Sequence, residues 1–252
     1  LPTSTQYSRN SLFSGLFPLE IQKKFPEYWR NDSDEGGKNM YEELFLRKLV
    51  DEKFHHDIKL SYNKITNIDF GRKFVNQINN LSNNELNVIV YNFVDMLSHA
   101  RTDMKVIKEL AEDDYAYRSL TLSWFEHSPL REILKKISDQ AAKLIITTDH
   151  GTINVEKPIK IIGDRNVNSN LRYKQGKNLN FKANEVFEIS DPHSYFLPKQ
   201  NISSKFIFGT GKNYFVYQNN YNNFVNFYKN TYQHGGISME EILVPIIKLN
   251  SK

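Results

Sequence analysis

Ile145-Ile146-Thr147-Thr148-Asp149-His150-Gly151 joins an apolar run to a carboxylate, an imidazole and a glycine. This order is typical of a buried parallel strand whose carboxyl end opens onto a site. On a continuing strand Asp149 and His150 would face opposite ways, so they can approach one ligand only if the strand ends and Gly151 lets the backbone turn. Taken alone, the pair is more simply explained as a polar strand end with a hydrogen-bonded histidine. The rest of the sequence changes this balance.

A second apolar run, residues 86–94, leads directly into Asp95 and His99. The spacing of four residues places these two side chains on one face of a helical turn. Residues 128–140 predict a helix that leads into a strand at 144–148, and this strand, helix, strand order predicts a parallel pair with a right-handed crossover. We therefore expect an α/β fold with a mainly parallel central sheet flanked by helices.

The remainder of the chain is less regular. Between residues 152 and 231 we expect irregular structure and a hairpin, formed by strands at 206–210 and 214–218, before a last strand at 242–249. His234 precedes two glycines. Because glycines have a mobile backbone and no side chains to pack against, His234 is poorly explained as a core residue.

Composition limits the chemistry. The chain has 252 residues, a formal net charge of +4 and no cysteine, so any metal must be held by His, Asp, Glu or Thr. No run is long and apolar enough for a signal peptide or a membrane span, so we expect a cytoplasmic protein without membrane insertion. The sequence starts at Leu1 without Met, and we expect that it is the C-terminal part of a longer protein whose first strand or preceding domain is absent here.

Six residues of metal-ligand type stand out, and their oxygen and imidazole groups suit a pair of zinc ions. They are Thr5, Asp95, His99, Asp149, His150 and His234. Two such ions about 4 Å apart can clamp a phosphoryl group between the attacking and the leaving oxygen. Thr5 lies where a loop enters a helix, a position that favours an anion, although by itself it is an ordinary N-cap threonine.

Together these motifs resemble the alkaline phosphatase superfamily and, within it, the PglZ domain. The resemblance runs from residue 2 to about residue 249. The resemblance rests on four motifs: Thr5 followed by Gly15-Leu16-Phe17-Pro18; Asp95-x-x-x-His99; Asp149-His150-Gly151; and His234-Gly235-Gly236-Ile237-Ser238 with the following Glu240-Glu241 and Val244-Pro245.

The resemblance implies a zinc-dependent phosphodiesterase with up to two zinc ions per chain, acting on cyclic or linear oligonucleotides. It makes Thr5 the nucleophile. Asp95, His99 and His234 would bind one zinc, and Asp149, His150 and Thr5 the other. A further zinc-binding aspartate of the family lies upstream of the nucleophile, and nothing precedes Leu1 in this sequence.

Four residues are candidates for binding the substrate. The asparagine that binds phosphate in related enzymes falls at Ser8 by spacing, and Arg9 or Asn10 could replace it; Asn10 is our candidate. The basic side chains of Arg165, Arg172 and Lys174 could hold phosphates, although a solvated basic loop explains each of them equally well.

Residues 94–102 and 172–174 resemble the effector domains of PorX-type response regulators that control type IX secretion. That likeness implies an upstream receiver domain and linker, and partners among secretion or transcription-regulatory proteins; homodimerisation is left open. Two alternatives remain: a zinc-stabilised protein-interaction module with little catalysis, and a PglZ protein of a phage-defence system.

Overall fold

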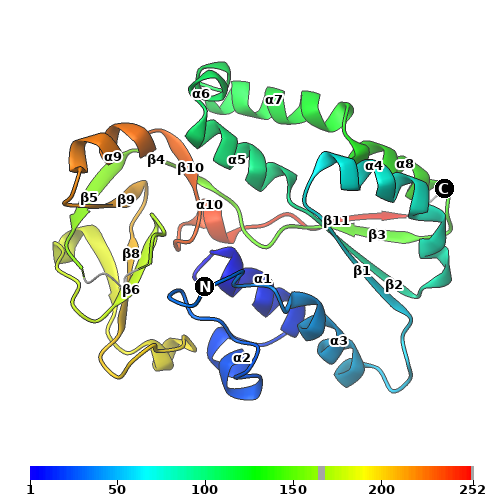
Figure 1. Cartoon of the computed structure of the whole chain (residues 1–252), viewed down its shortest axis with the longest axis horizontal. Coiled ribbons are helices and arrows are strands. Elements are labelled where there is room, and N and C mark those ends of the chain that lie inside the picture. Colours follow the sequence, from blue (N-terminus) through cyan, green and yellow to red (C-terminus); the bar gives the residue numbers. More distant parts are fainter. Residues whose placement is uncertain (164–167, 251–252) are drawn as a thin grey trace. The chain divides into compact units, whose positions relative to one another are not determined.

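Two compact units make up the chain in the computed structural model, which describes residues 1–163 and 168–250 (Figure 1). Unit 1 comprises Leu1–Leu49 and Thr148–Val244, and unit 2 comprises Val50–Thr147 and Pro245–Lys252. Each unit therefore combines two segments that are distant in the sequence. Within the described ranges, no helix has the combination of length and apolar character needed to cross a membrane.

Unit 1 is built from short strands in three small sheets, as far as its described residues go. Strands β6, β8 and β7 form an antiparallel sheet in that order, β5 pairs with β9 in parallel, and β4 pairs with β10 antiparallel. The elements are α1 (Thr5–Ser14), α2 (Pro18–Lys24), α3 (Glu42–Lys53, which continues into unit 2), β4 (Ile153–Val155), β5 (Lys157–Ile161), β6 (Tyr173–Gly176), η2 (Ala183–Glu185), β7 (Val186–Ile189), η3 (Pro192–Tyr195), β8 (Lys205–Gly209), β9 (Asn213–Tyr217), α9 (Tyr221–Tyr228), β10 (Thr231–Gln233) and α10 (Met239–Ile242).

Helix α1 is fixed in unit 1 by one aromatic side chain. Tyr7 is 1% exposed, and its ring packs edge-on against Trp29, Tyr173 and Phe206, with centroids 5.7, 5.9 and 6.2 Å away. Such edge-to-face contacts add to the free energy gained by burying the rings. Because Tyr7 lies in the first turn, these contacts hold the N-terminus of α1 against the sheet of β6 and β8.

Unit 2 contains a parallel pair of strands covered by helices. In Figure 1 α4 and α8 run together beside β1 and β2, and Ile65, Phe74, Ile78 and Ile133 form the core between them. The elements are β1 (Leu60–Ile65), α4 (Ile68–Gln77), η1 (Ile78–Asn83), β2 (Leu86–Tyr91), α5 (Phe93–Asp103), α6 (Lys105–Leu110), α7 (Asp114–Glu126), α8 (Pro129–Ser138), β3 (Lys143–Ile146) and β11 (Ile247–Asn250).

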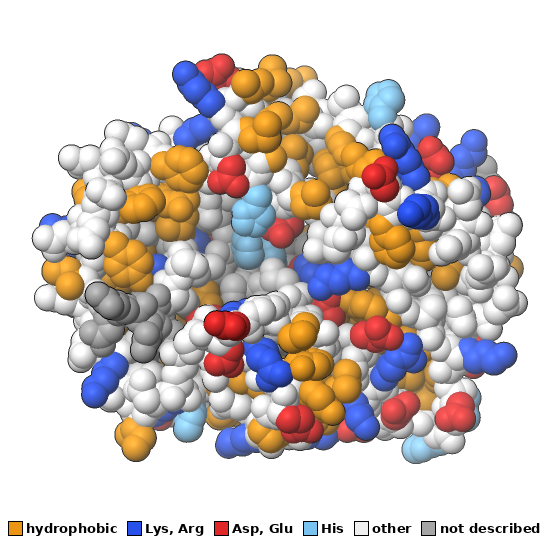
Figure 2. Space-filling view, in the orientation of Figure 1, with side chains coloured by type: hydrophobic (Ala, Val, Ile, Leu, Met, Phe, Trp, Pro, Cys, Tyr) orange, Lys and Arg blue, Asp and Glu red, His pale blue; other side chains and the backbone are white. Residues whose placement is uncertain are grey.

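Helices α5, α6 and α7 of unit 2 are joined by polar contacts and by the stacking of Phe93 on Trp124. The guanidinium of Arg101 donates to the carbonyl oxygens of Ala111 at 2.6 Å and Glu112 at 3.1 Å, and the hydroxyls of Ser98 and Tyr117 are 2.7 Å apart. Apolar side chains remain exposed on α6 and α7 (Figure 2). The buried side chain of Arg101 therefore connects α5 to the segment that follows α6.

The expected α/β class is confirmed, but the strands are arranged differently from the expectation. The described strands form five small sheets instead of one mainly parallel central sheet. Strand β2 ends at Tyr91, because the chain turns there into α5, and its partner is β1. Strand β3 pairs antiparallel with β11. The last strand starts at Ile247, because the capping box of Ser238 and Glu241 starts helix α10 before it.

The predicted hairpin at residues 206–218 is wrong. Both strands exist, as β8 and β9, but β8 pairs with β6 and β7 while β9 pairs with β5. Tyr214, Phe215 and Val216 are all at most 2% exposed. A strand that is buried on both faces packs between two cores, so β9 joins a different sheet from its neighbour in the sequence.

Candidate functional site

Thr5 is the first residue of α1, at a helix N-terminus that favours an anion. The N-cap residue Ser4 makes no side-chain capping bond, and the first turn has no acidic residue. The first N–H groups of a helix have no partner inside it, and the helix dipole adds partial positive charge there. A phosphate group beside Thr5 would therefore meet backbone donors and a favourable electrostatic potential.

The His150 imidazole presents one nitrogen to Thr5. Its Nδ1 lies 3.0 Å from the carbonyl oxygen of Gly151, and its Nε2 lies 3.4 Å from Oγ1 of Thr5. A carbonyl oxygen only accepts, so Nδ1 carries the proton and Nε2 has its lone pair on the side of the threonine hydroxyl. The ring is buried, which fixes this orientation.

His234 stands in the same arrangement. Its Nδ1 lies 3.1 Å from the carbonyl oxygen of Thr3, so Nε2 is again the lone-pair nitrogen. The two imidazoles are stacked, with centroids 3.8 Å apart and planes 5° from parallel. Metal-binding histidines usually donate their other N–H to a carbonyl or a carboxylate, which fixes the tautomer. Both rings therefore fit the role of metal ligands.

Asp149 completes this group in unit 1. Its Oδ2 lies 3.9 Å from Nε2 of His150 and 3.3 Å from Nε of Arg9, and it accepts a hydrogen bond from Ser8 at 3.4 Å. Arg9 also lies 3.9 Å from the Glu42 carboxylate. Ser8 and Arg9 follow Thr5 on α1, so the helix that carries the hydroxyl also orients the carboxylate.

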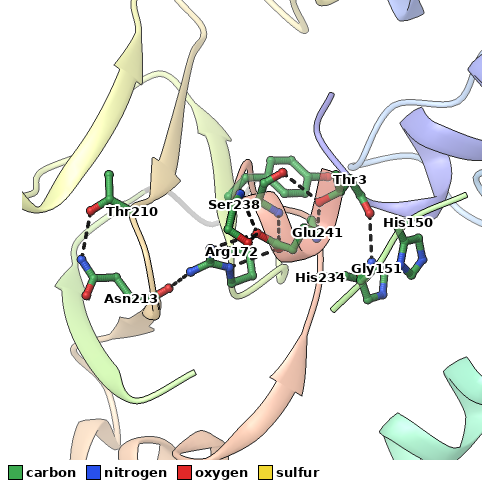
Figure 3. A network of polar contacts seen from close by, with 12 residues as sticks. Thr3, His150, Gly151, Arg172, Thr210, Asn213, His234, Ser238 and Glu241 are labelled. Atoms are coloured by element: carbon green, nitrogen blue, oxygen red, sulfur yellow. Dashed lines mark hydrogen bonds and ion pairs between the residues drawn. The ribbon is translucent and has the colours of Figure 1, made fainter. Parts of the chain in front are cut away.

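The backbone around His234 is held by the network in Figure 3. Thr3 Oγ1 donates to the carbonyl oxygen of Gly236 at 2.8 Å and accepts from the N–H of Gly235 at 3.1 Å. The carboxylate of Glu241 accepts the N–H of Gly236 at 2.7 Å and both donors of Ser238. Gly235 has a φ of 110°, a conformation that favours glycine.

Arg172 and Glu241 form a buried ion pair at the centre of this network. Both side chains are 0% exposed, and two hydrogen bonds of 3.2 and 3.0 Å join them. A further guanidinium N–H donates to the carbonyl oxygen of Asn213. Burial raises the pKa of Glu241, but the hydrogen bond and charge of Arg172, with the Gly236 N–H, outweigh this and leave the pKa below its ordinary value.

Glycine at position 151 is required by a close approach of two chain segments. The N–H of Gly151 donates to the carbonyl oxygen of Glu241 at 2.9 Å, and a Cβ atom at this position would collide with the backbone of Glu240. Gly151 therefore does more than permit the turn that the sequence predicts. It joins the segment of Asp149 and His150 to the segment that follows His234.

Asp95 and His99 belong to unit 2, where α5 carries both. His99 Nε2 lies 3.6 Å from Asp95 Oδ1, so one helical turn does bring the two side chains together, as their spacing predicts. Asp95 lies in the first turn of α5 and not at the end of the preceding strand.

The surroundings of the predicted substrate-binding residues differ from those of a basic phosphate site. Asn10 is 1% exposed and donates to the carbonyl oxygen of Lys38 at 3.2 Å. Arg172 is the partner of Glu241, which favours a structural role over contact with a phosphate. Lys174 is 1% exposed and donates to the carbonyl oxygen of Asn168 at 2.7 Å. Arg165 lies outside the described residues.

The ammonium group of Lys174 makes stability depend on pH. Burial lowers the pKa of Lys174 from 10.5 to about 7, against the attraction of Asp32. Between these values the unfolded chain keeps a proton that the native chain has released, so stability rises with pH. We expect denaturant unfolding to show a gain of about 1–2 kcal/mol between about pH 7 and about pH 9. Lys174→Met should remove this gain; an equal gain in the variant would contradict the assignment.

Sequence reasoning missed Asp32, which lies in a segment that reads as a surface loop. Asp32 accepts hydrogen bonds from the Tyr173 hydroxyl at 3.0 Å and from Asn168 Nδ2 at 2.8 Å. Burial raises the pKa of Asp32, against these hydrogen bonds and the charges of Lys38 and Lys174. No local sequence signal marks contacts across more than a hundred residues.

Comparison with known proteins gives one family. The family model described as BREX system PglZ alkaline phosphatase-like domain matches residues 1–249. A search of curated proteins gave no match. The matched range contains every candidate ligand, in both units. The chain therefore belongs to the family of PglZ alkaline phosphatase-like domains.

Proposed function

We propose that this protein is a zinc-dependent phosphodiesterase that uses Thr5 as its nucleophile. One observation carries the proposal: the Thr5 hydroxyl lies 3.4 Å from the lone-pair nitrogen of His150 at the N-terminus of α1. His234 stacks on His150, and Asp149 lies beside it. Membership of an alkaline phosphatase-like family supports hydrolysis of a phosphate ester.

In unit 1 the groups that would hold a metal ion are Thr5 Oγ1, an Asp149 carboxylate oxygen and the Nε2 atoms of His150 and His234. The donor set of oxygen and imidazole nitrogen suits zinc, and both imidazoles have the tautomer that binding needs. A bound zinc ion would supply a Lewis acid that lowers the pKa of the threonine hydroxyl. From the family resemblance we further propose Asp95 and His99 as ligands.

The chain's own residues support two successive displacements at phosphorus. In the first, Thr5 Oγ1 loses its proton to solvent and bonds to phosphorus, while the bond to the leaving alcohol oxygen breaks and that oxygen takes a proton from water. In the second, a water oxygen bonds to phosphorus and gives up a proton to solvent, while the bond to Oγ1 breaks and Oγ1 takes up a proton, which restores the threonine hydroxyl. The N-terminus of α1 stabilises the phosphate in both steps.

Metal analysis tests the ligand set without relying on activity. Protein purified without chelator should contain zinc, and His150→Ala should lose most of the ion that unit 1 holds, because one of its imidazole ligands is gone. Asp95→Asn should also lower the zinc content. His193→Ala is the matched control, since His193 is an exposed histidine of the same unit. A zinc content in His150→Ala equal to that of the wild type would contradict the assignment.

Two biological settings follow from different observations. The family description names a BREX system, which favours a role in phage defence. Residues 94–102 and 172–174 resemble PorX-type response regulators, which favours an effector domain that controls type IX secretion and acts on oligonucleotides. Activity on cyclic and linear oligonucleotides tests the second setting, and loss of phage protection in Thr5→Ala cells tests the first.

A further inference from the structure

A polar hollow opens beside the proposed nucleophile. Its volume is 330 Å³, and Thr5, Asp32, Lys38, Asn168 and Tyr173 are among the residues that line it. All of these belong to unit 1. Because Thr5 is part of the lining, a group attached to a phosphate at Thr5 would lie within reach of this hollow, which we call the Asp32 pocket.

The Asp32 pocket presents acceptors that need donors. Asp32 accepts from Tyr173 and Asn168, which hold its carboxylate in one place; Oδ2 accepts from both donors, and Oδ1, which shares only the Tyr173 hydroxyl, keeps a lone pair for a ligand. Asn168 donates its Nδ2 to Asp32, and its Oδ1 is buried without a hydrogen-bond partner among the described residues. A buried acceptor without a donor costs free energy, so a ligand that brings hydroxyl or N–H groups would be favoured.

The rest of the lining limits what that ligand can be. Among the described lining residues none is Ala, Val, Leu, Ile, Met or Phe, and the Tyr173 ring is packed in the core against Tyr7 and Phe206. A nucleobase usually stacks on an exposed aromatic ring, which this pocket does not offer. A second phosphate would meet the carboxylate of Asp32 as well as the ammonium of Lys38, so the described charged lining residues give no net positive charge to hold it.

The group that remains is a sugar. It is directly bonded to the phosphate of a nucleotide, and its hydroxyls are donors; a carboxylate that accepts from the 2′-hydroxyl is a recurring way to bind ribose. We propose that the Asp32 pocket binds the ribose of the substrate and that the enzyme prefers ribonucleotides to deoxyribonucleotides. This inference rests on the proposed phosphodiesterase function.

The first test compares two substrates that differ by one kind of group. The dinucleotide adenylyl-(3′,5′)-adenosine and its 2′-deoxy counterpart are hydrolysed by wild-type protein with zinc. A hydrogen bond from a hydroxyl to a carboxylate predicts a kcat/KM about 10-fold or more higher for the ribonucleotide. Equal values for the two dinucleotides would overturn the ribose assignment while leaving phosphodiester hydrolysis intact.

A variant then tests whether Asp32 is responsible for the preference for ribonucleotides. Asp32→Asn keeps the size of the side chain and an acceptor for Tyr173 but removes the negative charge, so the ratio of ribonucleotide to deoxyribonucleotide kcat/KM should fall toward one. Asp191→Asn removes a carboxylate from an exposed position of the same unit and should keep the wild-type ratio. An unchanged ratio in a folded Asp32→Asn protein would overturn the assignment to this pocket.

A binding measurement separates this inference from the proposed function. Calorimetry should give wild-type protein a dissociation constant for adenosine 5′-monophosphate about 10-fold lower than for its 2′-deoxy form. If the protein hydrolyses no phosphodiester but shows this difference, the catalytic proposal fails and the ribose pocket stands. If hydrolysis occurs but the two dissociation constants are equal, the ribose pocket fails and the catalytic proposal stands.

Discussion

Replacement of Thr5 by alanine is expected to lower the rate of phosphodiester hydrolysis by roughly a thousandfold or more, because the variant lacks the hydroxyl that attacks phosphorus. The two histidines of the site in unit 1 keep the hydrogen bonds that orient them in this variant. His150 still donates to the carbonyl oxygen of Gly151, and His234 to that of Thr3. The measurement is the release of p-nitrophenolate from bis(p-nitrophenyl) phosphate with zinc present.

Thr5→Ser is the matched control for this loss. Serine keeps the hydroxyl and lacks only the methyl group, so the variant should retain part of the wild-type rate. If Thr5→Ala hydrolysed the substrate as fast as wild type, Thr5 would be only the start of a helix, and the proposed mechanism would be wrong.

The largest expected effect on stability comes from Glu241. Its carboxylate pairs with Arg172 and accepts the N–H groups of Gly236 and Ser238, all of them buried or partly buried. Glu241→Ala leaves the Arg172 charge buried and uncompensated, which costs about 3–5 kcal/mol of unfolding free energy. Urea unfolding followed by circular dichroism measures it. The loss should also loosen the loop that carries His234 and so lower the zinc content.

Two control variants show whether this loss of unfolding free energy comes from the buried ion pair. Glu43→Ala removes an exposed carboxylate that pairs with Arg47 at 2.8 Å, and its effect should stay within about 0.5 kcal/mol. Glu241→Leu combined with Arg172→Met removes both buried charges and should be less destabilised than Glu241→Ala alone. If Glu241→Ala unfolded at the same urea concentration as wild type, the buried pair would have no role in holding the loop.

The sequence predicted candidate ligands from local patterns, and the structure brings Thr5, Asp149, His150 and His234 together in unit 1. His234 was recognisable because it precedes two glycines, where packing explains it poorly, and Asp149 and His150 because they follow an apolar run that ends before Gly151. The pairing of Asp95 with His99 follows from helical spacing alone. These predictions depend on local geometry, which a sequence contains.

Features that depend on distant partners were not predictable. Arg172 resembled a phosphate ligand because Glu241, which neutralises it, lies 69 residues away. Asp32 resembled a loop residue because its donors Tyr173 and Asn168 come from the other half of the chain. The same limit applies to the sheets: strands of three to six residues carry too short a pattern to specify their partners.

The stereochemistry of hydrolysis tests the central claim most directly. A phosphodiester analogue whose phosphorus is made chiral by sulfur and an oxygen isotope is hydrolysed in isotopically labelled water, and the configuration of the product is determined. Each in-line displacement inverts the phosphorus, so attack by Thr5 followed by attack by water predicts net retention of configuration. Net inversion would show a single attack by water and would contradict the assignment of Thr5 as the nucleophile.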